Sequence, residues 1–126
     1  MHYMVMLVLH KVDECTHILD AWDAEGVGGI TILESSGMGR ARRMSLTHNI
    51  PLIPSLSDFL RSPEHRHRTL FTVVEDEAWV DRLIAVTEGI LGSMESPDNG
   101  VIFVLPVVRA RGLAGGQARA KKGGRE

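Results

Sequence analysis

Two amphipathic segments, each placed between short apolar runs, constrain the fold of this chain more than any other feature. In residues 12–26 apolar side chains recur at helical spacing, with two acids in the first turn and a glycine at the end. Residues 75–92 repeat this pattern. Apolar or β-branched runs typical of strands stand at 3–10, 29–35, 69–74 and 101–108. The predicted order is therefore strand–helix–strand, a long connection, and strand–helix–strand.

This order predicts an α+β fold of the ferredoxin-like type, βαββαβ, with a four-stranded antiparallel sheet and two helices on one face. The strands are nearly apolar on both faces, so we expect the second face of the sheet to be buried in an oligomer. A homotrimer that packs three sheets into a central core is one closed solution. Pro106 cannot donate to a ladder, which places that end of the last strand at an edge or bulge.

Length and composition predict one domain and a short tail. The 126 residues suffice for a single core, which we assign to residues 1–113. Residues 114–126 are rich in glycine, alanine and basic residues, and we expect a flexible basic tail. No apolar run approaches the roughly 18–20 residues of a membrane span. The single cysteine, Cys15, cannot form an internal disulfide, and a cytoplasmic location fits.

Charge alternates along the chain in four blocks. Residues 1–39 and 69–108 are acidic, whereas residues 40–68 carry six arginines against two carboxylates and residues 109–126 are also basic. The block at about 40–68 coincides with the long connection between the second and third strands, contains three prolines, and is expected to be a functional loop. Its basic side chains could dock an acidic partner or bind anions. Those assigned to partner binding are Arg42, Arg43, Arg61, Arg66 and Arg68.

Several function classes are disfavoured by what this loop and the rest of the chain lack. Phe59 is the one aromatic residue in residues 40–68, so the interleaved aromatics of a nucleic-acid interface are missing. The chain has no G-x-S-x-G, no phosphate-binding Walker loop and no HExxH, and we expect no enzymatic activity. His65 and His67 are a conceivable metal pair with His48 in the same loop, but their arginine neighbours disfavour a cation.

Two groups of residues are candidates for binding a small anion. In the run Gly37, Met38, Gly39 and Arg40, the glycines let the backbone approach a ligand and the arginine can pair with a phosphate in a bidentate way. Arg109 and Arg111 are placed at the end of the last strand, where alternation puts both on one face. These two arginines could contact a ligand, or they could simply be solvated charges at the end of an edge strand.

Two stretches resemble a known family. The stretch GGITILESSGMGR, residues 28–40, is similar to the second strand and the start of the T-loop in the P-II nitrogen regulatory proteins, whose pattern is G-x-T followed by G-x-G-R. The stretch NGVIFV, residues 99–104, together with Val107 resembles the turn into that family's last strand. The resemblance covers about residues 1–112. The residues that fit the first pattern are Gly29, Thr31, Gly37, Gly39 and Arg40.

The resemblance implies a homotrimeric signalling protein that binds a small anionic ligand between subunits. An adenine nucleotide (ATP, ADP or AMP) is the expected ligand, and its binding would change how the T-loop engages a regulated protein. By this resemblance and the glycine–arginine pattern, the ligand-binding residues would be Thr31, Gly37, Met38, Gly39, Arg40, Asn99, Gly100, Arg109 and Arg111.

The chain also departs from the family pattern. Val101 stands where the family has a phosphate-binding lysine, Ala41 stands where it usually has a glutamine, and the one tyrosine, Tyr3, is outside the loop. Two alternatives therefore stay open. One is a metal-ion-responsive protein of the same fold that uses the loop histidines. The other is a protein-interaction module that binds no ligand.

Overall fold

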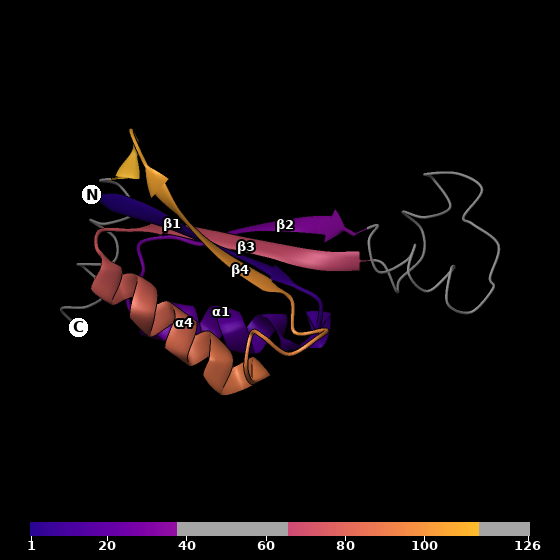
Figure 1. Cartoon of the computed structure of the whole chain (residues 1–126). Helices are drawn as coiled ribbons and strands as arrows, with labels where there is room; N and C mark the ends of the chain where they lie inside the picture. The colour runs from indigo at the N-terminus through magenta and orange to yellow at the C-terminus, as the bar shows by residue number, and fades with distance from the viewer. Residues whose placement is uncertain (38–65, 114–126) are drawn as a thin grey trace, which may run out of the picture.

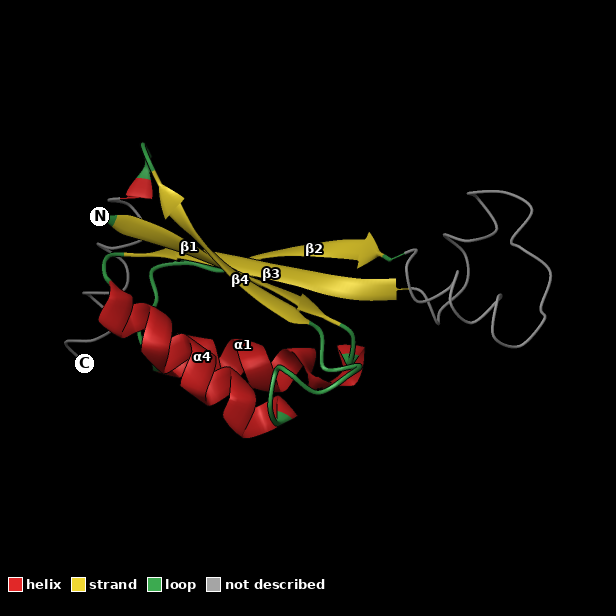
Figure 2. Ribbon diagram, in the orientation of Figure 1, coloured by secondary structure: helices red, strands yellow, loops and turns green. Residues whose placement is uncertain are grey.

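A four-stranded antiparallel sheet carries two helices on one of its faces in the computed structural model, which describes residues 1–37 and 66–113 (Figures 1 and 2). Along the chain the order is strand, short 3-10 helix, helix, strand, then strand, helix, strand. The predicted ferredoxin-like α+β fold is confirmed. The elements are β1 (His2–Leu9), η1 (Val12–Glu14), α1 (Cys15–Ala24), β2 (Thr31–Ser36), β3 (Arg66–Val74), α4 (Glu77–Leu91) and β4 (Val101–Val107).

The sheet has the strand order β2-β3-β1-β4, so β1 and β3 are central and β2 and β4 form the edges. This order confirms the edge position expected from Pro106, since β4 pairs with β1 alone among the described strands. Alternate residues of β1, Val5, Leu7 and Leu9, are fully buried beneath the helices. They meet Ile18 and Trp22 of α1 and the buried side chains of α4, which completes one hydrophobic core.

Polar contacts tie the two helices to each other within this core. The indole Nε1 of Trp22 donates a hydrogen bond to Oγ1 of Thr87 at 2.9 Å, and that hydroxyl donates to the carbonyl of Leu83 at 2.7 Å. Both side chains are completely buried. The buried polar atoms are thus satisfied inside the helix pair, as a low-dielectric interior requires.

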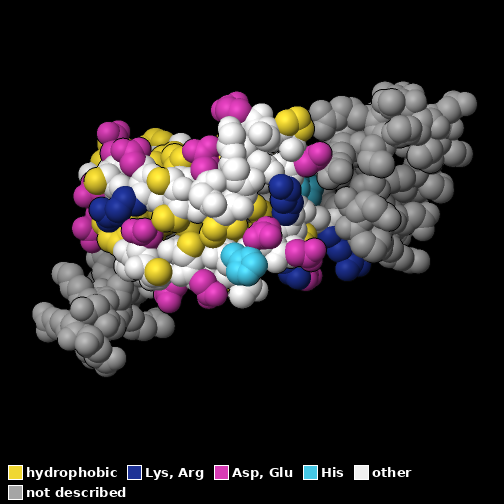
Figure 3. All heavy atoms as spheres, turned by 90° about the horizontal axis from the view of Figure 1, so that it is seen from below, with side chains coloured by type: hydrophobic (Ala, Val, Ile, Leu, Met, Phe, Trp, Pro, Cys, Tyr) yellow, Lys and Arg dark blue, Asp and Glu magenta, His cyan; other side chains and the backbone are white. Residues whose placement is uncertain are grey.

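The predicted C-terminal end of α4 is confirmed, whereas the helix begins at Glu77 rather than at Glu75. The Asp76 side chain accepts a hydrogen bond from the Trp79 backbone N–H at 3.0 Å and caps the helix, and Gly92 ends it. The outer surface of the helix layer is rich in carboxylates, as seen from below in Figure 3. No helix within the described residues is long and apolar enough to span a membrane.

All four strands differ from their predicted ranges by one to three residues at an end, and two of these differences move candidate site residues. β3 begins at Arg66 rather than Thr69, so Arg66, His67 and Arg68 belong to a strand and not to the loop. These three residues are all polar and give no apolar pattern, but pairing with β2 extends the strand through them. β4 ends at Val107, because its last partner is His2 at the start of β1. Arg109 and Arg111 therefore lie beyond the strand, and the alternation that placed them on one face does not apply.

The sheet face turned away from the helices (the open face) is strongly apolar. The strand registers align Phe71, Met6 and Phe103 in one row across β3, β1 and β4, with Val73, Met4 and Leu105 in a neighbouring row. Phe103 is 49% exposed and Leu33 of β2, on the same face, is 50% exposed. The predicted double-sided apolarity of the strands is therefore present as an uncovered apolar surface in the single chain.

Tyr3 gives a measurable check on the contact between β1 and the first turn of α4. Its hydroxyl donates to Oε1 of Glu77 at 3.4 Å. Burial raises the pKa of Tyr3 above its ordinary value of 10.0, and the charge of Glu77 and this hydrogen bond raise it further. The folded protein thus holds the phenol proton more tightly than the unfolded chain, so the stability from this group is lost as pH rises above about 10.

We expect the ultraviolet absorbance of phenolate to titrate above the ordinary midpoint, and Glu77→Gln to move that midpoint downward. Tyr3 is the only tyrosine in the chain, so the signal has a single source. An unchanged midpoint in Glu77→Gln would show that the carboxylate has no effect on the phenol.

Candidate functional site

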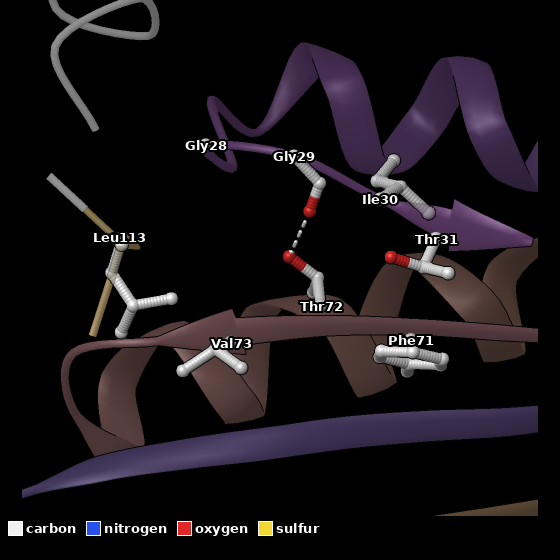
Figure 4. Close-up of a pocket in the computed structure, with 9 residues that line it drawn as sticks. Gly28, Gly29, Ile30, Thr31, Phe71, Thr72, Val73 and Leu113 are labelled. Atoms are coloured by element: carbon white, nitrogen blue, oxygen red, sulfur yellow. Dashed lines mark hydrogen bonds between the residues drawn. The ribbon is translucent and has the colours of Figure 1, made fainter. Parts of the chain in front are cut away.

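A hollow of about 350 Å³ lies where the chain enters β2 and runs beside β3. We call it the glycine pocket (Figure 4). The walls come from three segments far apart in the sequence: the turn before β2, the second half of β3, and the end of the described chain. The lining residues are Gly28, Gly29, Ile30, Thr31, Phe71, Thr72, Val73, Gly112 and Leu113.

The shape of the glycine pocket depends on a hydrogen bond between its two main walls. The hydroxyl of Thr72, which is 2% exposed, donates to the Gly29 carbonyl at 2.5 Å and holds the turn against β3 (Figure 4). A Cβ added at Gly29 would meet no atom within 4 Å, so the space in front of this residue is open. None of the described lining residues carries a charged side chain, and Phe71 and Thr31 face each other across the register. Such a wall suits the flat, largely neutral part of a ligand.

Four strand termini meet at the opposite end of the sheet, where β2 ends and β3 begins (the loop end). The ring of His67 occupies the space that a Cβ at Gly37 would need, so a larger residue there would displace this ring. The rings of His67 and His10 are stacked, with their centroids 4.3 Å apart and an angle of 22° between the ring planes. Gly37 therefore has a packing role directly after the end of β2.

Asn99 and Gly100, both predicted to contact ligand, hold the connection between α4 and β4. Asn99 is 4% exposed, and its Nδ2 donates to the Ser93 carbonyl at 2.8 Å. At Gly100, φ is 103° and an added Cβ would collide with the carbonyl oxygen of Val8. The side chain of Asn99 is thus committed to the fold, and its ligand contact stays a prediction.

The predicted ligand residues fall into two groups that one chain does not bring together. Thr31 lines the glycine pocket, whereas Gly37, Asn99 and Gly100 lie at the loop end. Gly37 follows Thr31 by six positions along and just past β2, which corresponds to roughly 20 Å of extended strand. Arg109 and Arg111 are exposed and follow the end of β4, which pairs with the start of β1 and is therefore remote from the loop end.

Other predicted residues are placed only in part. Of the five arginines assigned to partner binding, Arg66 and Arg68 lie on β3, and Arg68 pairs with Glu34 across the hairpin at 2.7 Å. Within the described ranges no three histidine, cysteine or acidic side chains are grouped so that they could hold a metal ion. The remaining predictions concern residues outside the described part of the chain: Met38, Gly39, Arg40, Arg42, Arg43, His48, Arg61 and His65.

Sequence reasoning missed several residues of the glycine pocket. Phe71, Thr72 and Val73 read only as strand residues, and Leu113 read as the last residue before the tail. The pair Gly28–Gly29 carried a usable signal, because two glycines before a strand often mark a close approach of backbone or ligand.

A comparison with known protein families finds no family that matches this chain, and a comparison with curated proteins finds no relative.

Proposed function

We propose that this chain is a P-II-like regulatory protein that assembles as a homotrimer and binds an adenine nucleotide between its subunits. Ligand binding would change the state of the segment at residues 38–65, which then engages or releases a protein partner. The resemblance of residues 28–40 and 99–104 to the P-II pattern and the ferredoxin-like fold both support this proposal.

The observation that carries the proposal is the glycine pocket. It lies beside Gly29 and Thr31, two residues of the P-II-like pattern, and its open, uncharged wall fits a nucleobase. The backbone groups of Gly28 to Ile30 supply polar atoms next to the ring of Phe71 and the hydroxyl of Thr31.

The uncovered apolar face supports assembly into a closed oligomer. The rows through Met6 and Met4 place aromatic and aliphatic side chains over three strands of the open face. A contiguous surface of this kind is typical of an interface rather than of a free monomer. A trimer would bury the three faces against one another.

The separation of the two groups of candidate residues favours a ligand shared by two copies. We propose that a nucleotide whose base lies in the glycine pocket of one chain places its phosphates against the loop end of a neighbouring copy. Arg40 would then be a phosphate contact supplied at the loop end.

The test is a thermal-shift screen at fixed protein concentration with ATP, ADP, AMP and adenosine. A ligand present at 100 times its dissociation constant should stabilise the protein by about 2.7 kcal/mol, which is several degrees for a chain of this size. Gly29→Leu should abolish the shift, because its side chain extends into open space in the pocket. Gly89→Leu on α4, where an added Cβ also meets no atom within 4 Å, is the matched control and should keep the shift.

A nucleotide shift that survives in Gly29→Leu would refute the pocket assignment. Arg40→Ala tests the phosphate contact separately, and it should weaken ATP and ADP while sparing adenosine.

A second candidate function is a protein-interaction module without a ligand. The residues that the structure describes around the glycine pocket carry no charge, and valine stands at position 101; both observations favour this second function. No thermal shift with any nucleotide at several millimolar, together with an intact trimer, would select this second function over the first.

A further inference from the structure

A second pocket, of about 470 Å³, opens beside the loop-end half of the β2–β3 hairpin. We call it the arginine pocket, and we propose that it binds a small phosphate ester. It is separate from the glycine pocket and shares no residue with it. The lining residues are Val12, Glu34, Ser35, Ser36, Arg66, His67 and Arg68.

The hairpin register places the cationic groups of this pocket side by side. Arg66 and Arg68 are two residues apart on β3, so their side chains leave the same face of the sheet. Arg68 pairs in register with Leu9, which is buried under the helices, so this is the helix-bearing face. On β2 the partners in register are Ser36 opposite Arg66 and Glu34 opposite Arg68. Two guanidinium groups and a hydroxyl therefore leave one side of the hairpin.

Planar guanidinium groups match the oxygen geometry of phosphate and can each donate two parallel hydrogen bonds. A water molecule takes up about 30 Å³ in the liquid, and a phosphate ion is only a few times larger. A pocket of about 470 Å³ therefore has room for more than a bare phosphate. Val12 of η1 adds an apolar wall. The remaining volume therefore fits the carbon skeleton of a small ester, with its phosphate between the two arginines.

Glu34 is an internal competitor for this ligand. Its Oε1 accepts a hydrogen bond from an Arg68 guanidinium nitrogen at 2.7 Å. The glutamate side chain is 82% exposed, whereas the arginine side chain is 34% exposed. A solvent-exposed ion pair contributes little to stability, so Glu34 can turn into solvent when a dianion takes its place on Arg68. The carboxylate would then set the affinity of the pocket by occupying it when no ligand is bound.

This arrangement predicts opposite effects from removing two charges that touch each other. Arg68→Gln should weaken phosphate binding about tenfold or more, the usual consequence of losing a hydrogen bond to a charged group. Glu34→Gln should tighten it severalfold, because it frees Arg68 and removes a like charge from the site. A purely structural role for the pair predicts no gain from Glu34→Gln.

The experiment is a nitrogen-15 NMR titration of the full chain with inorganic phosphate, ribose 5-phosphate and ribose. Saturable shifts of the Ser36, Arg66 and Arg68 amides are expected with both phosphates and not with ribose, and ribose 5-phosphate should bind more tightly than inorganic phosphate. Glu77→Gln and Arg82→Gln change the same charges on α4, away from the pocket, and should leave the affinities unchanged.

Equal phosphate affinity in wild type and in the Arg66→Gln, Arg68→Gln double variant would overturn the proposal. So would an equal gain in Glu34→Gln and Glu77→Gln, since it would reveal a general charge effect. Inorganic phosphate binding as tightly as ribose 5-phosphate would overturn the assignment of an ester. The outcome is independent of the nucleotide proposal, because adenosine should shift the Gly29 and Thr31 amides and leave Ser36 unmoved.

Discussion

Replacing Trp22 with alanine should lower the free energy of unfolding by about 3–5 kcal/mol. The side chain is completely buried between the sheet and α4, and its indole N–H bonds to Thr87. The substitution removes the largest fully buried side chain and leaves a cavity that the surrounding helices and strands fill only in part. This is a large share of the roughly 5–15 kcal/mol that stabilises a typical domain. Urea denaturation followed by far-ultraviolet circular dichroism, at one protein concentration, measures the loss.

Thr87→Val separates the hydrogen bond from the packing. Valine keeps nearly the same shape but cannot accept from the indole, so a buried donor is left unsatisfied at a cost of about 1–3 kcal/mol. A Trp22→Ala loss of less than 1 kcal/mol, or a neutral Thr87→Val, would contradict the packing described for α1 and α4.

Replacing Phe103 with glutamate should convert the assembled protein into monomers. The side chain is 49% exposed in the single chain, so the substitution does not disturb the internal core. In an assembly through the open face, however, it would bury an unpaired carboxylate among methionine and phenylalanine side chains, which costs far more than an interface of this kind can offset. Sedimentation equilibrium should give three times the chain mass of 13.9 kDa for wild type and 13.9 kDa for the variant.

Ala85→Glu is the matched control for this prediction. Ala85 is exposed on α4, within the helix layer, so the same new charge should leave the mass unchanged. A wild-type protein that sediments as a monomer, or a Phe103→Glu variant that stays assembled, would refute assembly through the open face.

The two helices and the cores of the four strands could be predicted from local patterns. Ile18 and Trp22 recur at helical spacing, and both are fully buried. The acidic run at 75–77 and the glycine at position 92 also indicated approximately where α4 begins and ends, because dipole and capping effects act within one turn. These features depend on interactions between near neighbours in the chain.

The first three residues of β3 show where local patterns fail. Arg66, His67 and Arg68 have no strand-like apolarity, and they become a strand through pairing with Ser36, Ser35 and Glu34. The Arg68–Glu34 ion pair and the arginine pocket follow from that pairing. Neither could be predicted, because the two sides of the hairpin are joined by about thirty residues of chain.

For the candidate ligand residues, too, the sequence indicated positions, whereas the structure was needed to show their roles. Glycines at 29, 37 and 100 stood out in the sequence, but the reasons for them differ. Gly29 opens a pocket, Gly37 makes room for His67, and Gly100 lets β4 approach Val8. A glycine in a sequence indicates that another group lies close to the backbone, but it does not identify that group.

The sequence by itself determined where the two helices and the apolar centres of the four strands lie, and that the strands are apolar on both faces, because these features depend on local periodicity and residue type. Only the tertiary structure decided the order β2-β3-β1-β4, the extent of β3, and which side chains line the two pockets. Those features depend on backbone pairing between residues far apart in the chain. Many alternative registers are compatible with the same local pattern, and burial of one face of the sheet in the core determines which register forms.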